Sequence, residues 1–240
     1  MKRSVWIILG IAFFLVCLVV ATPAWIVRDI IVKQQPAMAV GNVSGRVWRG
    51  ELDVVQYQGI TLSGIRWTLN PIGLISGVPL AIAVNEPVQG EGDVGIGSEQ
   101  TLQLRNVNVE GQLARLLNAM NFPSMGFDGG ISLALQEAKI NATGCISIAG
   151  TMTLNALSGD IEGVDSIAPV TASLSCENKR IVLAIDENNS AKVRGTVRIS
   201  VNGQMNGQLM LSPAPATPLF NSLTQFMGRP ANGKDFILRL

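Results

Sequence analysis

The chain has 240 residues, of which 48% are hydrophobic and 15% charged, and its formal net charge is +1. It contains no histidine, so Ser-His-Asp and Cys-His triads and the usual histidine-containing zinc sites are excluded. Four of the 18 Lys and Arg residues and one of the 17 Asp and Glu residues precede Gln34. The remainder therefore carries a small net negative charge, and a nucleic-acid partner, which needs a basic face, is not expected.

The first segment, residues 5–27, contains no charged residue. As a helix it is long enough to cross a bilayer core, which takes roughly 20 apolar residues. Lys2 and Arg3 precede it and favour a cytoplasmic amino terminus. We therefore predict a cytoplasmic tip and membrane anchor at 1–33 and an exported domain at 34–240. A cleaved signal peptide is the alternative, but its apolar region would be shorter, roughly 7–15 residues.

Beta patterns dominate the first half of the exported part. In residues 65–69 the apolar residues Ile65, Trp67 and Leu69 alternate strictly with polar ones, which is typical of a half-buried strand. A phase shift between Leu104 and Val107 indicates a bulge or bend. Residues 86–99 form either a twisted hairpin or a loop. The strands expected here are 43–48, 52–57, 60–62, 65–69, 79–84 and 102–109.

The second half repeats the strand pattern, with hairpin turns expected at 177–179 and 187–189. Strands are expected at 130–136, 140–154, 170–176, 180–186, 192–201, 204–211 and 235–240. Two short helices are predicted. Helix 111–120 has Leu113 and Leu117 on one face, and helix 218–227 has Thr217 as its cap and Pro218 at its first position. So many strands favour a mainly β fold, as a curved antiparallel sheet or a two-layer β domain.

Three cysteines are present. Cys17 lies in the apolar segment, whereas Cys145 and Cys176 lie in the exported part. A pair of cysteines in an oxidising compartment favours a disulfide, and two separate buried thiols are the alternative. In the chain-entropy model such a bridge stabilises by roughly 3–4 kcal/mol.

Three short motifs stand out in the exported part. They are Gly-x-Val-Trp-x-Gly at 45–50, Trp-x-Leu-x-Pro at 67–71, and Gly-Arg-Pro followed by a glycine at 228–233. The motif residues are Gly45, Trp48, Gly50, Trp67, Pro71, Gly228, Pro230 and Gly233. In their order, behind a membrane anchor, they resemble the type II secretion system protein N family, also called general secretion pathway protein N.

The resemblance implies an accessory component of the type II secretion system in the cell inner membrane, with the bulk of the chain in the periplasm. It implies support for the export of folded periplasmic proteins across the outer membrane. The implied partners are other secretion-system subunits of the inner membrane and periplasm. No catalytic residue, cofactor or metal is implied, and we expect no enzyme activity. The acidic cluster of Asp160, Glu162 and Asp165 also lacks the calcium-loop pattern.

The first motif is also similar to AsmA-like envelope proteins, which accommodate lipid in a β-sheet groove. This alternative requires a continuous apolar sheet face without a complementary cover. For Trp48 and Trp67 two interpretations remain, either core residues or docking residues at an interface. We favour the core, because Ile65, Trp67 and Leu69 point to one sheet face, which must either be buried or leave a large apolar patch exposed.

Overall fold

The computed structural model describes residues 6, 10, 13, 14, 17, 20–57, 59–119, 126–167 and 169–239. Ten of the 23 residues in the apolar run at 5–27 fall outside them. Within the described residues, no helix is both long enough and apolar enough to cross a membrane. The anchor therefore stays a prediction.

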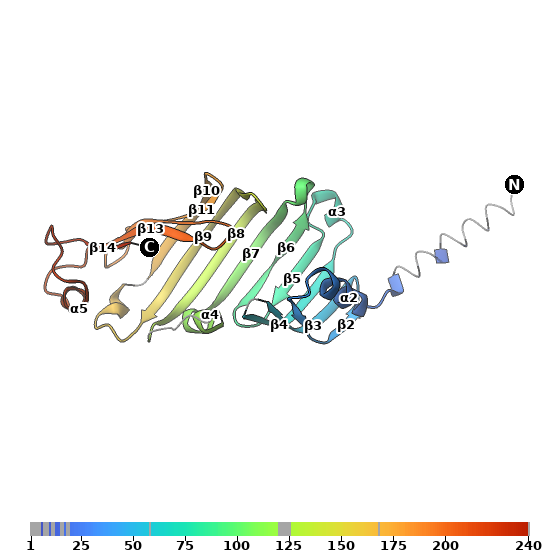
Figure 1. Ribbon diagram of the computed structural model, residues 1–240, viewed down its shortest axis with the longest axis horizontal. Helices are drawn as coiled ribbons and strands as arrows, with labels where there is room; N and C mark the ends of the chain where they lie inside the picture. Colours follow the sequence, from blue (N-terminus) through green and yellow to red (C-terminus); the bar gives the residue numbers. More distant parts are fainter. Residues whose placement is uncertain are drawn as a thin grey trace.

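Residues 39–239 carry one antiparallel sheet of fourteen strands. Each strand from β3 onward pairs with the next strand along the chain, so the sheet is a continuous meander from β3 to β14 (Figure 1). The predicted mainly β, antiparallel fold is confirmed, and all fourteen strands belong to one hydrogen-bonded sheet. The strands are β1 Ala39–Val40, β2 Val43–Arg46, β3 Arg49–Tyr57, β4 Ile60–Leu69, β5 Leu80–Val84, β6 Gln89–Ile96, β7 Leu102–Gln112, β8 Asp128–Asn141, β9 Gly144–Ser158, β10 Val170–Glu177, β11 Arg180–Ile185, β12 Arg194–Ile199, β13 Met205–Leu211 and β14 Phe236–Arg239.

The bulge predicted in β7 is confirmed. Glu91 pairs with Asn108 and Asp93 pairs with Arg105, so β7 carries one extra residue between the two pairs. Asn106 lies there at φ +50°, in the left-handed region that Asn tolerates better than most residues. Its side-chain amide donates a hydrogen bond to Asp93 Oδ2 at 3.2 Å. The bulge restores the apolar alternation to one face after the phase shift.

Two strand predictions need correction. Residues 60–62 and 65–69 belong to one strand, β4, which continues through Gly64 at φ +64°. The single strand expected at 140–154 is wrong, because a hairpin turn separates β8 from β9 there. Asn141 Oδ1 accepts hydrogen bonds from the backbone N–H groups of Thr143 and Gly144 at 2.9 and 3.2 Å. This side-chain turn competes with the strand, although the neighbouring residues favour extended backbone.

The helix predicted at 218–227 is confirmed as α5 Pro218–Met227. Its cap, Thr217, accepts a hydrogen bond from the N–H of Phe220 at 3.3 Å. The other predicted helix is shorter than expected: α4 Leu113–Ala119 begins where β7 ends at Gln112, and position 120 lies outside the described residues.

Further short helical segments were not expected. The one-turn helix α3 Gly73–Ser76 joins β4 to β5 and ends at Gly77 in the left-handed conformation. Two 3₁₀ turns, η1 Ser98–Gln100 and η2 Val164–Ser166, lie in loops. Helix α2 Trp25–Gln34, by contrast, precedes the sheet and coincides with the end of the helix predicted for the anchor at 1–33.

The best-buried cluster lies at the C-terminal end of the sheet, where α5 and η2 pack on the last strands. Leu219 and Leu223 of α5 contact a cluster that includes Val164 of η2 and Phe236 of β14. Phe220 meets Phe236 edge to face, with ring centroids 5.3 Å apart. Elsewhere in the described residues no large side chain is completely buried. Figure 1 places α2 and α5 near the two ends of the sheet, and α3 and α4 at the ends of its strands.

Candidate functional site

The first two motifs meet in one corner of the sheet. Gly45 pairs with Gly50 across β2 and β3, and Gly50 pairs with Trp67 across β3 and β4. A Cβ atom at position 50 would overlap the six-membered ring of Trp67, so the ring lies flat across this glycine. Gly45 has φ +90°, which favours glycine. The two motifs, although separate in the chain, therefore form a single packing unit.

Hydrogen bonds fix the same corner. Trp67 Nε1 donates to the carbonyl of Val47 at 2.9 Å, and the N–H of Leu69 donates to the carbonyl of Trp48 at 2.7 Å. Both Trp side chains are half-buried. The predicted common face of Ile65, Trp67 and Leu69 is confirmed, because all three line one cavity. Complete burial of the two Trp residues is not observed, and their core role remains a prediction.

The motif corner also holds the last part of the apolar run, from Thr22 onward. Val47 N–H donates to the carbonyl of Thr22, and Ala24 N–H donates to the carbonyl of Gly45, both at 3.1 Å. Pro23 forms an isolated antiparallel bridge with Arg46. Ala24 is buried. The Gly45–Gly50 motif is therefore the place where the amino-terminal segment joins the sheet.

Helix α2 crosses the sheet next to this corner and leaves a cavity of about 320 Å³ between them. The cavity lining is entirely apolar. It consists of Val27, Ile31, Val43, Val47, Leu52, Ile65, Trp67, Leu69, Leu80 and Ile82. This volume lies at the lower end of the range for small-molecule pockets, and such pockets are mostly apolar.

The apolar face continues beyond the cavity across the sheet. Strand pairing places one row of apolar residues and glycines side by side from β4 to β12. The row is Trp67, Ile82, Gly92, Val107, Leu135, Gly150, Leu174, Leu183 and Val197. Its side chains are half-buried, apart from the buried Leu135. Half-burial is expected of side chains that pack against their row neighbours without a second layer above them.

Over β2 to β7 the opposite face is polar. A groove of about 820 Å³ lies over β3 to β7. It is lined by charges of both signs, among them Arg66, Glu91 and Asp93, with Ala81 and Ala83 in the middle. The sheet is thus amphipathic, and the apolar row lies on the face that α2 covers at one end.

The third motif lies at the far end of the sheet. Gly228 ends α5 at φ +80°, and Gly233 N–H donates to the carbonyl of Pro230 at 2.9 Å. This loop presents Asn232, whose Oδ1 accepts from the N–H groups of Lys234 and Asp235 at 3.0 and 2.8 Å. The motif therefore shapes the turn that leads into the last strand.

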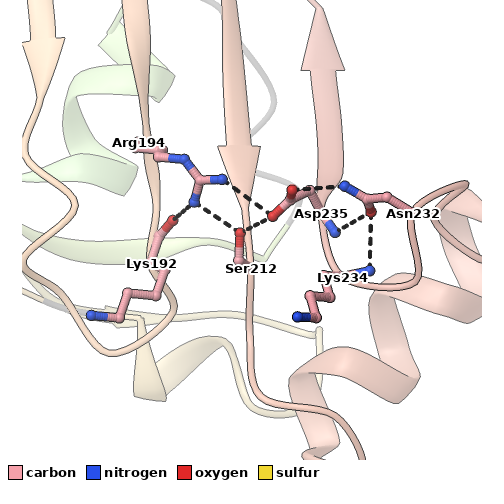
Figure 2. A network of polar contacts seen from close by, with 6 residues as sticks. All are labelled: Lys192, Arg194, Ser212, Asn232, Lys234 and Asp235. Atoms are coloured by element: carbon pink, nitrogen blue, oxygen red, sulfur yellow. Dashed lines mark hydrogen bonds and ion pairs between the residues drawn. The ribbon is translucent and has the colours of Figure 1, made fainter.

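A polar network attaches that turn to β12 and β13 (Figure 2). Arg194 donates to Ser212 Oγ at 2.9 Å and to Asp235 Oδ1 at 3.2 Å. Ser212 Oγ donates to the same carboxylate in a short hydrogen bond, and Asn232 Nδ2 donates to Asp235 Oδ2 at 2.8 Å. The hydrogen bond from Ser212, then those from Asn232 and Arg194, lower the pKa of Asp235. Sequence analysis did not predict this network. Its one trace in the sequence is the pair Asn232-Gly233, which is typical of a turn.

Cys145 and Cys176 are joined by a disulfide, with Cα atoms 5.8 Å apart. The bridge lies where β9 leaves the ladder, because β9 pairs with β10 only from Gly150 onward. Cys145 N–H donates instead to the carbonyl of Lys179 in the next hairpin. The disulfide thus holds together two hairpins whose hydrogen-bonded pairing has ended.

No metal centre is formed by the described part of the chain. No three acidic or cysteine side chains there gather closely enough to hold an ion. Asp160, Glu162 and Asp165, singled out above, lie in and beside the loop that leads into η2.

Comparison with known proteins assigns the family. The family model described as "Type II secretion system (T2SS), protein N" matches residues 36–238. The chain belongs to the type II secretion system protein N family. The predicted resemblance is therefore confirmed, and the matched range contains all three motifs.

Three relatives carry the family's name, type II secretion system protein N. The protein of Aeromonas hydrophila is 26% identical over 253 residues, covering 100% of this chain and 98% of the relative. That of Klebsiella pneumoniae is 25% identical over 223 residues, covering 88% and 84%. That of Pectobacterium carotovorum subsp. carotovorum is 26% identical over 117 residues, covering 48% and 46%. No solved structure matches the chain.

Proposed function

We propose that the chain is an accessory inner-membrane component of the type II secretion system that supports export of folded periplasmic proteins across the outer membrane. The observation that carries this is the family match over residues 36–238, which makes the chain a type II secretion system component. The inner-membrane site and the accessory role go beyond that match.

The proposed topology is an anchor at residues 1–33 with the amino terminus in the cytoplasm and residues 34–240 in the periplasm. The uncharged apolar run at 5–27 supports the anchor, although its part from Thr22 onward is already joined to the sheet. The disulfide supports an oxidising compartment for the sheet. The absence of histidine supports a role in assembly rather than catalysis. The partners we propose are other secretion-system subunits of the inner membrane and periplasm.

The proposal is tested by deleting the gene and measuring a secreted substrate in the culture medium. We expect the substrate to accumulate in the periplasm and secretion to return when the intact chain is supplied. A matched chain without residues 1–21, which keeps the segment hydrogen-bonded to the sheet and is directed to the periplasm by a cleavable signal, should restore less secretion. Equal secretion with and without the gene would contradict the proposed role in secretion. Full rescue by the unanchored chain would remove the need for an anchor.

A second candidate function is accommodation of lipid on the apolar sheet face. The row from Trp67 to Val197 and the 320 Å³ apolar cavity favour it, because a long exposed apolar surface on a monomer usually marks a binding site. A Val107→Glu variant places a charge in the middle of the row. The matched control is Asn108→Glu, one residue away on the polar face.

Lipid that co-purifies with the full-length chain would be extracted and identified by mass spectrometry. We expect it to be lost from Val107→Glu and retained by Asn108→Glu. Equal lipid content in the two variants would contradict the groove and leave the secretion role untouched.

A further inference from the structure

The connection between β4 and β5 carries two strongly exposed aliphatic side chains. Ile72 is 75% exposed and Ile75 is 91% exposed. The connection, residues 70–79, contains no charged residue. Its backbone is nevertheless ordered by hydrogen bonds. Asn70 Oδ1 accepts from the N–H of Ile72 at 3.0 Å, and the N–H of Asn70 donates to the carbonyl of Pro79 at 2.7 Å. Exposing the apolar side chains of this ordered, uncharged connection to water is energetically unfavourable.

More apolar side chains lie at the same end of the strands. Strand pairing places Leu69 beside Leu80 and Leu80 beside Val94, and Ile96 ends β6 opposite Leu102. Ile96 is 77% exposed, and Leu102 is also exposed. We call these strand ends, together with connection 70–79, the α3 rim. Figure 1 shows α3 at this end of the sheet, away from α4 at the opposite end.

The chain enters the sheet at this rim from the apolar run. Thr22 and Ala24 are hydrogen-bonded to Val47 and Gly45, at the turn between β2 and β3. The N–H of Leu69, the last residue of β4, donates to the carbonyl of Trp48 in that turn. Only one strand pairing therefore separates the entry point from the connection that carries Ile72 and Ile75.

Charges and an aromatic ring surround the entry point in the arrangement that bilayer interfaces favour. Trp25, the first residue of α2, is exposed, and Trp is enriched where membranes meet water. Arg46 and Arg49 face each other across the β2–β3 hairpin and are exposed. Basic side chains at this position attract anionic lipid head groups.

We propose that the α3 rim is a second membrane contact, in which Ile72 and Ile75 insert into the head-group region of the bilayer that the anchor crosses. This rests on the proposed anchor. Short apolar elements bind the interfacial layer by burying their side chains beside the acyl chains. Together with the hydrogen bonds that join Thr22 and Ala24 to the sheet, the rim would hold the sheet at a defined orientation to the membrane.

The proposal is tested with the full-length chain in vesicles of phosphatidylethanolamine and phosphatidylglycerol. An environment-sensitive fluorophore is attached to the thiol introduced at position 75 in an Ile75→Cys, Cys17→Ala chain, and nitroxide-labelled phospholipid serves as quencher. The matched control is Phe226→Cys in the same background, since Phe226 is 71% exposed on α5 at the other end of the sheet. The wild-type chain labelled at Cys17, its free cysteine, reports on the anchor.

We expect the nitroxide lipid to cause loss of emission at positions 17 and 75 and not at 226. Quenching at 17 without quenching at 75 overturns the membrane contact while leaving the anchor intact. A blue-shifted but unquenched signal at 75 overturns it in favour of a protein partner. Absence of quenching at position 17 contradicts both the proposed anchor and the proposed membrane contact of the rim.

Discussion

Trp67 lies across Gly50 of the neighbouring strand, so its ring occupies the space of any side chain at position 50. The ring also donates to the carbonyl of Val47. This single relationship links the first two family motifs. It also predicts that their substitutions are coupled.

Gly50→Ala should destabilise the chain, because a Cβ at this position overlaps the ring of Trp67 and overpacking typically costs about 1–3 kcal/mol. Trp67→Ala should cost about 2–4 kcal/mol, somewhat less than a fully buried Trp, because the ring is only half-buried. In the double variant the overlap disappears, so the total should fall below the sum of the two single effects.

Unfolding of the full-length chain in detergent, followed by fluorescence, would measure this coupling. Gly130→Ala is the matched control, since a Cβ there comes no closer than 3.7 Å to Asn155, an ordinary van der Waals distance. It should change stability little. Strict additivity of Gly50→Ala and Trp67→Ala would contradict the packing unit.

The Asp235 network predicts a dependence of stability on pH. Hydrogen bonds from Ser212, Asn232 and Arg194 lower the pKa of Asp235 in the folded chain. A depressed folded pKa contributes stability that is present above the unfolded pKa, about 3.9, and is lost as the pH falls through the folded pKa. Asp235→Asn should therefore be destabilising at neutral pH, and its difference from wild type should shrink in acid.

The measurement is the denaturant midpoint of both chains between neutral and acidic pH. Glu162→Gln, which replaces an exposed carboxylate outside the network, serves as the control and should follow wild type throughout. A constant difference between Asp235→Asn and wild type at every pH would rule out the proposed linkage.

The disulfide predicts a simple labelling pattern. Alkylation of the denatured, unreduced protein should modify Cys17 alone, because Cys145 and Cys176 are bridged. Replacing both bridged residues by Ala should cost roughly 3–4 kcal/mol. The Cys17→Ala chain is the control and should keep wild-type stability. Labelling of all three cysteines by mass spectrometry would show that the bridge does not form in the cell.

The helix cap Thr217 of α5 is expected to contribute less to stability than the disulfide. Thr217→Ala removes the acceptor of the Phe220 N–H and should cost about 1 kcal/mol. Gln225→Ala, on the exposed side of the same helix, should be nearly neutral. Thermal unfolding of the two variants compares them directly, and equal melting temperatures would contradict a contribution from the cap.

The sequence alone determined the features that depend on neighbouring residues. Alternation at Ile65, Trp67 and Leu69 identified a strand and its apolar face, and the phase shift before Val107 identified the bulge at Asn106. Thr217 and Pro218 located α5. Such patterns follow from the two-residue period of a strand and from capping chemistry, which act within a few residues.

Only the tertiary structure decided which of these elements meet. Whether the strands form one layer or two depends on pairing between distant residues, and so does the contact of Trp67 with Gly50. The polar network joins Arg194 and Ser212 to Asp235, which lies beyond α5. The residues next to each of them in the sequence do not indicate this contact. The turn at Asn141 was missed because its side-chain hydrogen bonds compete locally with an otherwise favourable strand. Register and long-range hydrogen bonds are properties of the folded sheet, so periodicity along one strand does not reveal them.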